Sequence, residues 1–589
     1  MTEIVWVIAL SAAGFLGWRA VPRRIGVVFL CGGLAVWMLV RAVQRLSTVE
    51  DLTVGVVPVA AVVAAGCWYR FVHSRTVVNR WGRAVRRKSG VASTWDIARF
   101  GSSLAMRRQA TTVRPKLAEL NRRKRMRVPT AEYAMSLCRA GVMRVHASIE
   151  DVVLVFGGPR CGKSGMLASR IIEAPGAVLV TSTRTDLYMV TTPLREAHHG
   201  PVRVFNPTGL GGLASTLMFD PVVGCRDPLT AAERAEDMLP CGSGESEREH
   251  WIGQARAVYA ALLHAAAFGN HSCQMIAEWI SDPGKAQLRV AQLLERSPDT
   301  TYGTSALQFF TTNDRTRSSI TSSMRPALEW LVNPDARAAC CGGQTVDVAD
   351  LLATHGTVHL LGAKAAHTGP LLAALTGHIA RQARRIAAEQ PTGRLPDPLT
   401  LALDEVASVS PVPLEQWTAD MGGRGVHIIA CFQSRAQLLS RWGTAGGAEI
   451  INNAGAIVLF GGTNDRDDLT YWSVRCGMRD EEVLTTDQQG QISGRSQRQV
   501  PVLSPAQLAN LPKFKVVVIR RHMAPVIGRA AMVWERRDVR AHTRAERAVL
   551  AAAQRATRPA WGASLRQRVT HTRSVRQINA ARRRARGRL

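Results

Sequence analysis

The sequence predicts an α/β protein whose parallel sheet is interrupted by an all-α subdomain and preceded by membrane-spanning helices. Short β-branched runs alternate with helical stretches over the middle and C-terminal parts of the chain. A glycine-rich segment lies directly between one such run and a helix. Near the N-terminus, two long stretches carry no charged residue. Together these features exclude a purely helical or purely β protein.

Residues 1–75 are expected to form a membrane anchor. The stretches 25–40 and 53–69 contain sixteen and seventeen uncharged residues, near the minimum that spans a bilayer. A third stretch, 4–18, has fifteen residues and fits a span, an interfacial helix or a signal-like segment. Arginines precede the first long stretch and follow the second, so both flanks are expected in the cytoplasm. We therefore expect a multi-pass cell-membrane protein with two or three spans; a buried helical hairpin of a soluble protein is the alternative.

Residues 76–145 form a basic region next to this anchor, densest at 121–127. Attraction to anionic lipid is the simplest interpretation, and contact with DNA is the alternative. The whole chain carries a net charge of +30, which predicts a polyanionic partner without distinguishing nucleic acid from a membrane surface. The 11 cysteines show no CxxC spacing, so we expect reduced thiols and no zinc finger.

A phosphate-binding loop is predicted after the buried run 151–156. The segment reads G-x-x-x-x-G-K-S, and it comprises Gly157, Gly158, Pro159, Arg160, Cys161, Gly162, Lys163 and Ser164. Glycines let backbone N–H groups surround phosphates, the lysine reaches the β- and γ-oxygens, and the serine hydroxyl ligates Mg²⁺. Because a strand precedes the segment and a helix follows it, we expect ATP and Mg²⁺ to bind here.

Two carboxylates are expected to complete this site. Asp404 and Glu405 follow the apolar run 399–403, which predicts a buried strand. Asp404 is the candidate Mg²⁺ ligand, and Glu405 is the candidate general base for the attacking water. An acidic pair at a helix N-terminus is the alternative.

The two motifs are widely separated, since Lys163 and Asp404 lie 241 positions apart. Residues 226–333 show helical periodicity and no strand pattern, so we expect an all-α insertion there. The nucleotide-binding domain would then comprise 146–225 and 334–534. Its further strands are predicted at 177–180, 357–360, 426–429, 456–459 and 515–519, in a parallel sheet covered on both faces.

Two further residues are candidates for catalysis. Arg424 lies in a glycine-rich turn before the run 426–429, where it could reach the γ-phosphate bound by a neighbouring subunit. Gln433 follows that run and could sense the γ-phosphate. Taken alone, Arg424 is more often a surface arginine, and Gln433 is more often a hydrogen-bonded polar residue of a loop.

These motifs together resemble the TraG/TraD class of type IV secretion coupling proteins. The resemblance covers most of residues 25–535, and it rests on the segments 157–164, 181–187, 219–221, 250–251, 403–405, 423–425 and 433–434. It implies a RecA-like P-loop NTPase motor that assembles as a homo-hexamer on the inner membrane. It also implies that ATP hydrolysis drives relaxase-bound single-stranded DNA into a type IV secretion channel during conjugation.

Residues 535–589 form a basic tail, with sixteen arginines against three acidic residues. We expect a disordered arm that contacts DNA or acidic lipid; a solvated tail without a partner is the alternative.

Three functional alternatives stay open at this point. An FtsK-type double-stranded DNA translocase also joins membrane helices to a RecA-like ring, but the helical insertion argues against it. A coupling ATPase that exports only proteins and a scaffold without hydrolysis are the others. The intact Lys163, Ser164, Asp404 and Glu405 argue against the scaffold.

Overall fold

The computed structural model describes residues 89–240, 246–341, 345–363, 367–486 and 492–557. These belong to the second of two units into which the chain divides, residues 1–85 and 86–589. The predicted spans within residues 1–75 lie outside the described residues. In the part that is described, no helix combines the length and apolar character needed to cross a bilayer.

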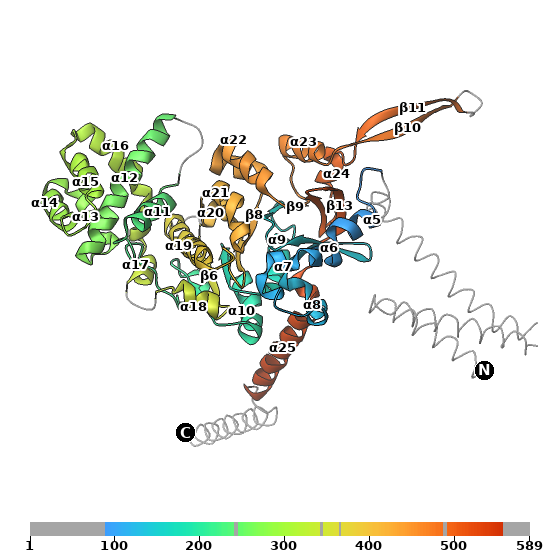
Figure 1. Cartoon of the computed structure of the whole chain (residues 1–589), viewed down its shortest axis with the longest axis horizontal. Helices are drawn as coiled ribbons and strands as arrows, with labels where there is room; N and C mark the ends of the chain where they lie inside the picture. The colour runs from blue at the N-terminus through green and yellow to red at the C-terminus, as the bar shows by residue number, and fades with distance from the viewer. Residues whose placement is uncertain (1–88, 241–245, 342–344, 364–366, 487–491, 558–589) are drawn as a thin grey trace, which may run out of the picture. The chain divides into compact units, whose positions relative to one another are not determined.

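A mixed sheet of eleven strands forms the centre of the second unit (Figure 1). Seven neighbouring strands are parallel, and their order is β9 (Ala456–Phe460), β3 (Val153–Phe156), β8 (Val426–Phe432), β7 (Leu399–Leu403), β4 (Val178–Ser182), β6 (Thr357–Leu361) and β5 (Val202–Phe205). Four antiparallel strands extend the sheet beyond β9, in the order β12 (Lys515–Arg520), β13 (Met523–Arg529), β1 (Ala134–Ala140) and β2 (Met143–Ser148). The α/β fold with a large parallel sheet is therefore confirmed.

The antiparallel strands correct two predictions. The run 515–519 is a strand, but β12 runs antiparallel to β9, with Val516 opposite Phe460. A short apolar run has the same composition in either direction, so only its connections fix the direction. The predicted domain boundary between residues 145 and 146 falls inside β2, so the sheet begins earlier than expected. Arg139 and Arg144, opposite each other near the turn of this hairpin, had obscured its apolar pattern.

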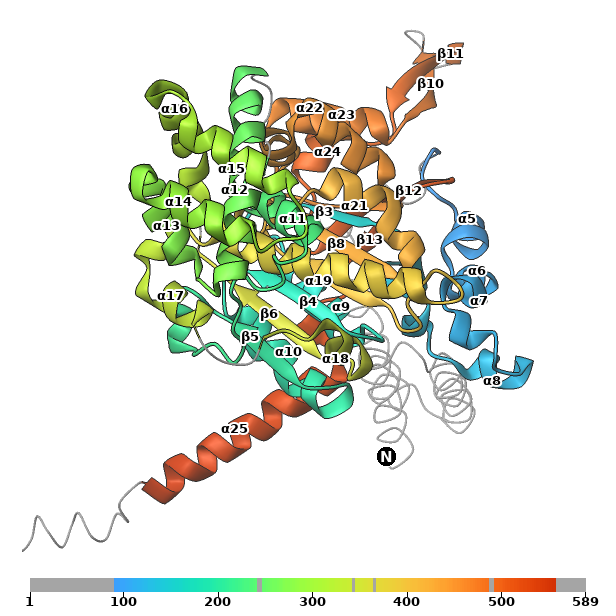
Figure 2. The ribbon, with the colours of Figure 1, turned by 60° about the vertical axis from the view of Figure 1, so that its left-hand side comes forward.

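Helices cover both faces of the sheet, because successive strand residues point to opposite sides. On one face, Val153 and Val155 of β3 pack with α9 (Lys163–Glu173). On the other face, Phe156 stacks on Phe432 with ring centroids 5.3 Å apart. The helices α22 (Arg435–Asn453) and α23 (Arg466–Arg475) reach these rings through Trp442 and Trp472. Figure 2 shows α19 (Gly369–Glu389) crossing over the strands as well.

Other helices are short, except for one that contributes Leu187 and Leu194 to the core beside α9. They are α5 (Thr94–Asp96), α6 (Ser103–Arg108), α7 (Ala110–Val113), α8 (Arg122–Arg127), α10 (Asp186–His198), α20 (Val406–Val409), α21 (Leu414–Asp420) and α24 (Pro505–Ala509). The basic cluster at 121–127 thus forms a short helix, α8, capped by the Asn121 side chain.

Between β5 and β6, the described residues form helices and no strand. The helices are α11 (Pro228–Met238), α12 (Ser246–Gly269), α13 (Cys273–Ser281), α14 (Pro283–Leu294), α15 (Thr301–Thr311), α16 (Asp314–Met324), α17 (Pro334–Cys340) and α18 (Val348–Ala353). In α12, Ala255, Tyr259 and Leu262 are fully buried on the face that the 3.6-residue period predicts. α12 to α16 lie together to one side of the sheet in Figure 1.

Several elements were not predicted, among them the strands β1, β2, β5 and β13. A separate two-stranded ribbon, β10 (Met478–Thr486) and β11 (Ile492–Pro501), projects from the region of α23 and α24 (Figure 1). Residues 537–557, expected to be disordered, form the helix α25 (Arg537–Thr557). Alanine and arginine have high helix propensity, and this outweighs the repulsion among the arginines. The rest of the predicted tail, 558–589, lies outside the described residues.

Candidate active site at the carboxyl edge of the sheet

The predicted phosphate loop connects the end of β3 to the start of α9. Its backbone turns tightly, with Arg160 at φ 59° and Gly162 at φ 112°. At Gly158 a side chain has no room, because a Cβ atom would lie 2.6 Å from the carbonyl oxygen of Gly462. The loop is therefore held against the segment that follows β9, and the glycine spacing has a steric reason.

Lys163 is buried, and its ammonium group donates to the carbonyls of Gly157 and Gly158, the latter at 3.0 Å. The lysine thus lies folded back along its own loop at the helix N-terminus. A nucleotide would offer phosphate oxygens to the same ammonium, at the end of α9 where the helix dipole also favours negative charge.

Asp404 meets this loop from the carboxyl end of β7. The Ser164 hydroxyl donates to Asp404 Oδ2 over 2.9 Å. Burial raises the pKa of Asp404 to about 6, although the hydrogen bond from Ser164 opposes this shift. The other oxygen, Oδ1, is buried and has no hydrogen-bond partner among the described residues. A desolvated, half-satisfied carboxylate beside a serine hydroxyl fits the oxygen ligands that Mg²⁺ requires.

Glu405 lies between two polar side chains from neighbouring strands. Gln433, which follows β8, donates through Nε2 to Glu405 Oε1 over 3.4 Å. Thr183, which follows β4, donates through Oγ1 to Glu405 Oε2 over 3.2 Å. The backbone of Glu405 is left-handed, at φ 49°, a conformation that costs free energy in a non-glycine residue. Both oxygens of the candidate base are thus oriented by hydrogen bonds.

The strand order explains how these residues come together. β8 lies between β3 and β7, and β4 lies beside β7. Parallel strands end at the same edge, so the loop, Asp404, Glu405 and Gln433 meet there. Thr183 was not among the predicted site residues. The sequence feature that could have indicated Thr183 is the polar segment after the apolar run 177–180, because this run ends at the same edge of the sheet.

Arg424 lies at the opposite edge of the sheet. It precedes β8, a strand of seven residues, whereas Gln433 follows that strand. At roughly 3.3 Å per residue, about 20 Å separates the two ends. Arg424 Nε contacts Asp420 Oδ1 at 3.5 Å. Within one chain, the structure therefore does not bring Arg424 to the loop, and its predicted role requires a second subunit.

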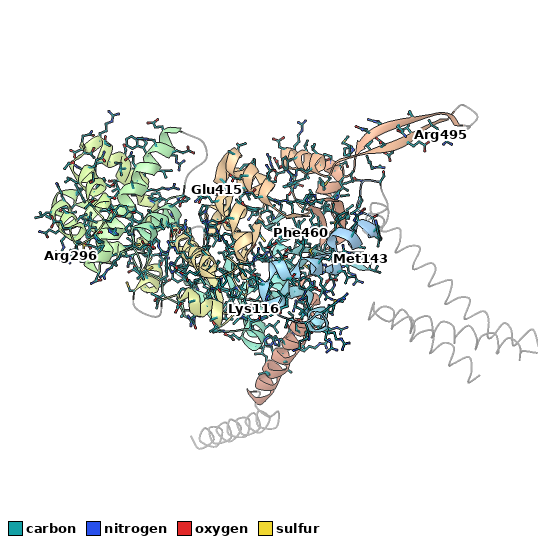
Figure 3. All side chains as sticks on the ribbon, in the orientation of Figure 1. Lys116, Met143, Arg296, Glu415, Phe460 and Arg495 are labelled. Carbon is teal, nitrogen blue, oxygen red and sulfur yellow. The ribbon has the colours of Figure 1, made fainter. Side chains whose placement is uncertain are left out.

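The amino edge of the sheet also holds a paired carboxylate, Asp397, just before β7. Arg114 and Lys116 donate to it, and His355 Nε2 lies 3.2 Å from its Oδ2. Burial raises the pKa of Asp397, but the hydrogen bonds from Lys116 and Arg114 outweigh this and lower the pKa to about 2. Figure 3 labels Lys116 in this cluster and Phe460 at the carboxyl end of β9.

Comparison with known proteins finds one family whose model matches the chain and solved structures with a similar fold. The family model of type IV secretory system conjugative DNA transfer proteins matches residues 105–556. The unbound bacterial conjugative coupling protein TrwB has a TM-score of 0.51 and 18% identity, over 69% of this chain and 90% of that one.

The plasmid coupling protein TrwB in complex with ADP and Mg²⁺ has a TM-score of 0.50 and 18% identity, over 69% of this chain and 91% of that chain. At this identity the likeness establishes the fold alone. No curated protein sequence matches the chain significantly.

Proposed function

The chain belongs to the type IV secretory system conjugative DNA transfer family, and we propose that it is a membrane-bound ATPase that drives single-stranded DNA into a secretion channel. One observation carries the ATPase assignment: Lys163, Ser164 and the Asp404–Glu405 pair converge at one edge of the sheet. The neighbouring carboxylates differ in their surroundings, which allows them different chemical roles.

In the proposed reaction, Lys163 binds the β- and γ-phosphates and Ser164 and Asp404 hold Mg²⁺. The ion supplies positive charge that neutralises the phosphates. Glu405 accepts a proton from the attacking water while Thr183 and Gln433 hold its carboxylate in place. The water oxygen bonds to the γ-phosphorus as the bond to the β–γ bridging oxygen breaks, which gives ADP and phosphate. The plasmid coupling protein TrwB, which has a similar fold, forms a complex with ADP and Mg²⁺, and this supports a nucleotide and Mg²⁺ as the molecules that the site binds.

The partners and the location belong to the same proposal. The predicted spans within residues 1–75 would place the motor on the cytoplasmic side of the cell membrane, where ATP is available. A reporter fused after Arg75 should then be cytoplasmic, and one fused near Val49 should be exterior. The opposite pattern would exclude this topology. A homo-hexamer that accepts relaxase-bound DNA through the insertion at 226–333 is the assembly that the family membership favours.

The cargo can be tested with the full-length chain purified in detergent. ATP hydrolysis is measured without nucleic acid, with single-stranded DNA and with duplex DNA, and the Lys163→Ala variant serves as the control. We expect stimulation by single strands and binding that weakens steeply as salt rises. Stimulation by duplex alone would favour an FtsK-type translocase. Indifference to both would favour protein export.

A further inference from the structure

The strand order also fixes the side of the loop on which a nucleoside would lie. Asp404, Glu405 and Gln433 follow β7 and β8, so the γ-phosphate must point toward these strands. β9, β12 and β13 lie on the other side of β3. The sugar and base of the same nucleotide must therefore leave the loop toward β12 and β13. This inference rests on the proposed nucleotide-binding function.

Two aromatic side chains stand on that side. Phe514 lies in the turn before β12, and Trp534 lies in the short 3₁₀ helix Val533–Glu535 after β13. Their ring centroids are 5.4 Å apart, with an interplanar angle of 62°. They come from segments that the order of the sheet brings together.

Both rings pack against the phosphate loop and the first turn of α9. A Cβ atom at Gly162 would lie 3.0 Å from Cδ1 of Phe514. A Cβ atom at Gly165 would lie 2.5 Å from Cζ3 of Trp534. The residue directly after Lys163-Ser164 is thus a glycine that leaves room for the indole ring.

Neither ring is fully buried: Phe514 is half-buried at the margin of the core, and Trp534 is exposed. Trp534 is 46% exposed, although its ring lies against Gly165 in the first turn of α9. Phe514 has φ 65°, which is a genuine outlier for a bulky side chain. Strained backbone of this kind persists where the surrounding structure enforces it, often beside a ligand. An exposed indole and a strained phenylalanine therefore meet at the end of the loop where a nucleoside is expected.

We propose that Trp534 and Phe514 form a stacking platform for the base of the bound nucleotide. Stacking uses the π face that every purine offers, so adenine and guanine should be held nearly alike. The platform would fix the nucleoside while Lys163 and Ser164 fix the phosphates. The alternative is that the rings only support the start of α9.

Calorimetric titration of the full-length chain with ADP, GDP and inorganic pyrophosphate, each with Mg²⁺, separates these roles. Trp534→Leu keeps an apolar side chain against α9 but removes the ring. The substitution should weaken the binding of ADP and GDP by about 10-fold and leave the affinity for pyrophosphate unchanged. Trp534→Phe should recover most of the loss. Phe514→Asn removes the second ring while its residue type tolerates the left-handed backbone, and it should act in the same direction.

Trp95→Leu is the matched control, because Trp95 is 71% exposed on α5, a helix that lies apart from α9 in Figures 1 and 2. Equal losses for ADP and pyrophosphate in Trp534→Leu would show that the ring supports the loop, and would overturn the platform. Unchanged ADP binding would overturn it too. If the wild-type chain bound neither ADP nor pyrophosphate, the proposed function itself would fail, and this outcome is distinct from the other two.

Discussion

The two ends of strand β7 carry aspartates in opposite states. Asp404, just after the strand, is buried, and one of its oxygens has no partner within the described part of the chain; its pKa is raised to about 6. Asp397, just before the strand, is surrounded by Arg114, Lys116 and His355, and its pKa is lowered to about 2. A carboxylate with all its partners in place holds parts of the fold together. A carboxylate that lacks a partner is available for a ligand. The two ends of this strand therefore differ in role: one stabilises the fold, and the other can bind a ligand.

Arg424 offers the strongest test of this difference between the two ends of the strands. It lies at the amino ends, as Asp397 does, and its side chain is paired with Asp420. If it acts on the nucleotide of a neighbouring subunit, Arg424→Ala should cut ATP turnover by about 10³- to 10⁵-fold and leave ADP affinity nearly unchanged. Steady-state hydrolysis and ADP titration measure the two effects.

Mixing Arg424→Ala with Lys163→Ala protein provides the control. Some interfaces in a mixed ring combine an intact loop with an intact arginine, so partial activity should return. If the two variants co-assemble and no activity returns, Arg424 has a structural role and does not act on the nucleotide of a neighbouring subunit.

Glu405→Gln tests the carboxyl ends of the strands, where the proposed catalytic residues lie. The glutamine keeps the shape of the side chain and one acceptor oxygen but cannot take a proton. We expect turnover to fall by about 10²- to 10⁴-fold with ADP binding preserved. Thr183→Val, which only removes a hydrogen bond to Glu405, should cost much less. If Glu405→Gln and Thr183→Val lowered the rate of hydrolysis equally in single-turnover assays, this would argue against Glu405 as the base.

Asp397→Asn tests the amino ends of the strands. With its pKa lowered to about 2 from 3.8, the ionised carboxylate stabilises the fold at neutral pH by about 2 kcal/mol. This contribution is complete above the unfolded pKa and is lost as the pH falls from about 4 toward 2. Chemical denaturation should therefore show a destabilised variant at pH 7 and a smaller difference near pH 3. Turnover per folded molecule should not change; a loss would connect this edge to catalysis.

The smallest expected effect concerns acidification at Asp404. A proton and Mg²⁺ compete for this carboxylate, so Mg²⁺-dependent ADP affinity should fall by about 10-fold per pH unit below about 6. Asp404→Asn should remove this dependence and weaken Mg²⁺ binding at every pH. Titrations at pH 5 and pH 7.5 would detect it, and a flat profile in the wild type would contradict a raised pKa.

Local patterns predicted the loop and the strand that carries Asp404, because both depend on neighbouring residues. The predicted strand 399–403 coincides with β7, and the loop lies between β3 and α9 as expected. The contacts of Glu405 with Thr183 and Gln433 depend on which strands are adjacent, which periodicity does not encode. The opposite direction of β12 depends on the connection through the β10–β11 ribbon. The position of Trp534 beside Gly165 depends both on which strands are adjacent and on the direction in which they run.

The central position of β3 has a consequence for how the chain is made. Its two neighbours, β8 and β9, begin at Val426 and Ala456, long after the phosphate loop has been synthesised. At about 5–20 residues per second, a nascent chain would expose β3 without either neighbour for roughly 10–60 s. The helical insertion depends on local contacts and can fold during this interval. A product truncated before Val426 would hold every residue of the loop and still leave β3 unpaired, so we expect such fragments to aggregate rather than bind nucleotide.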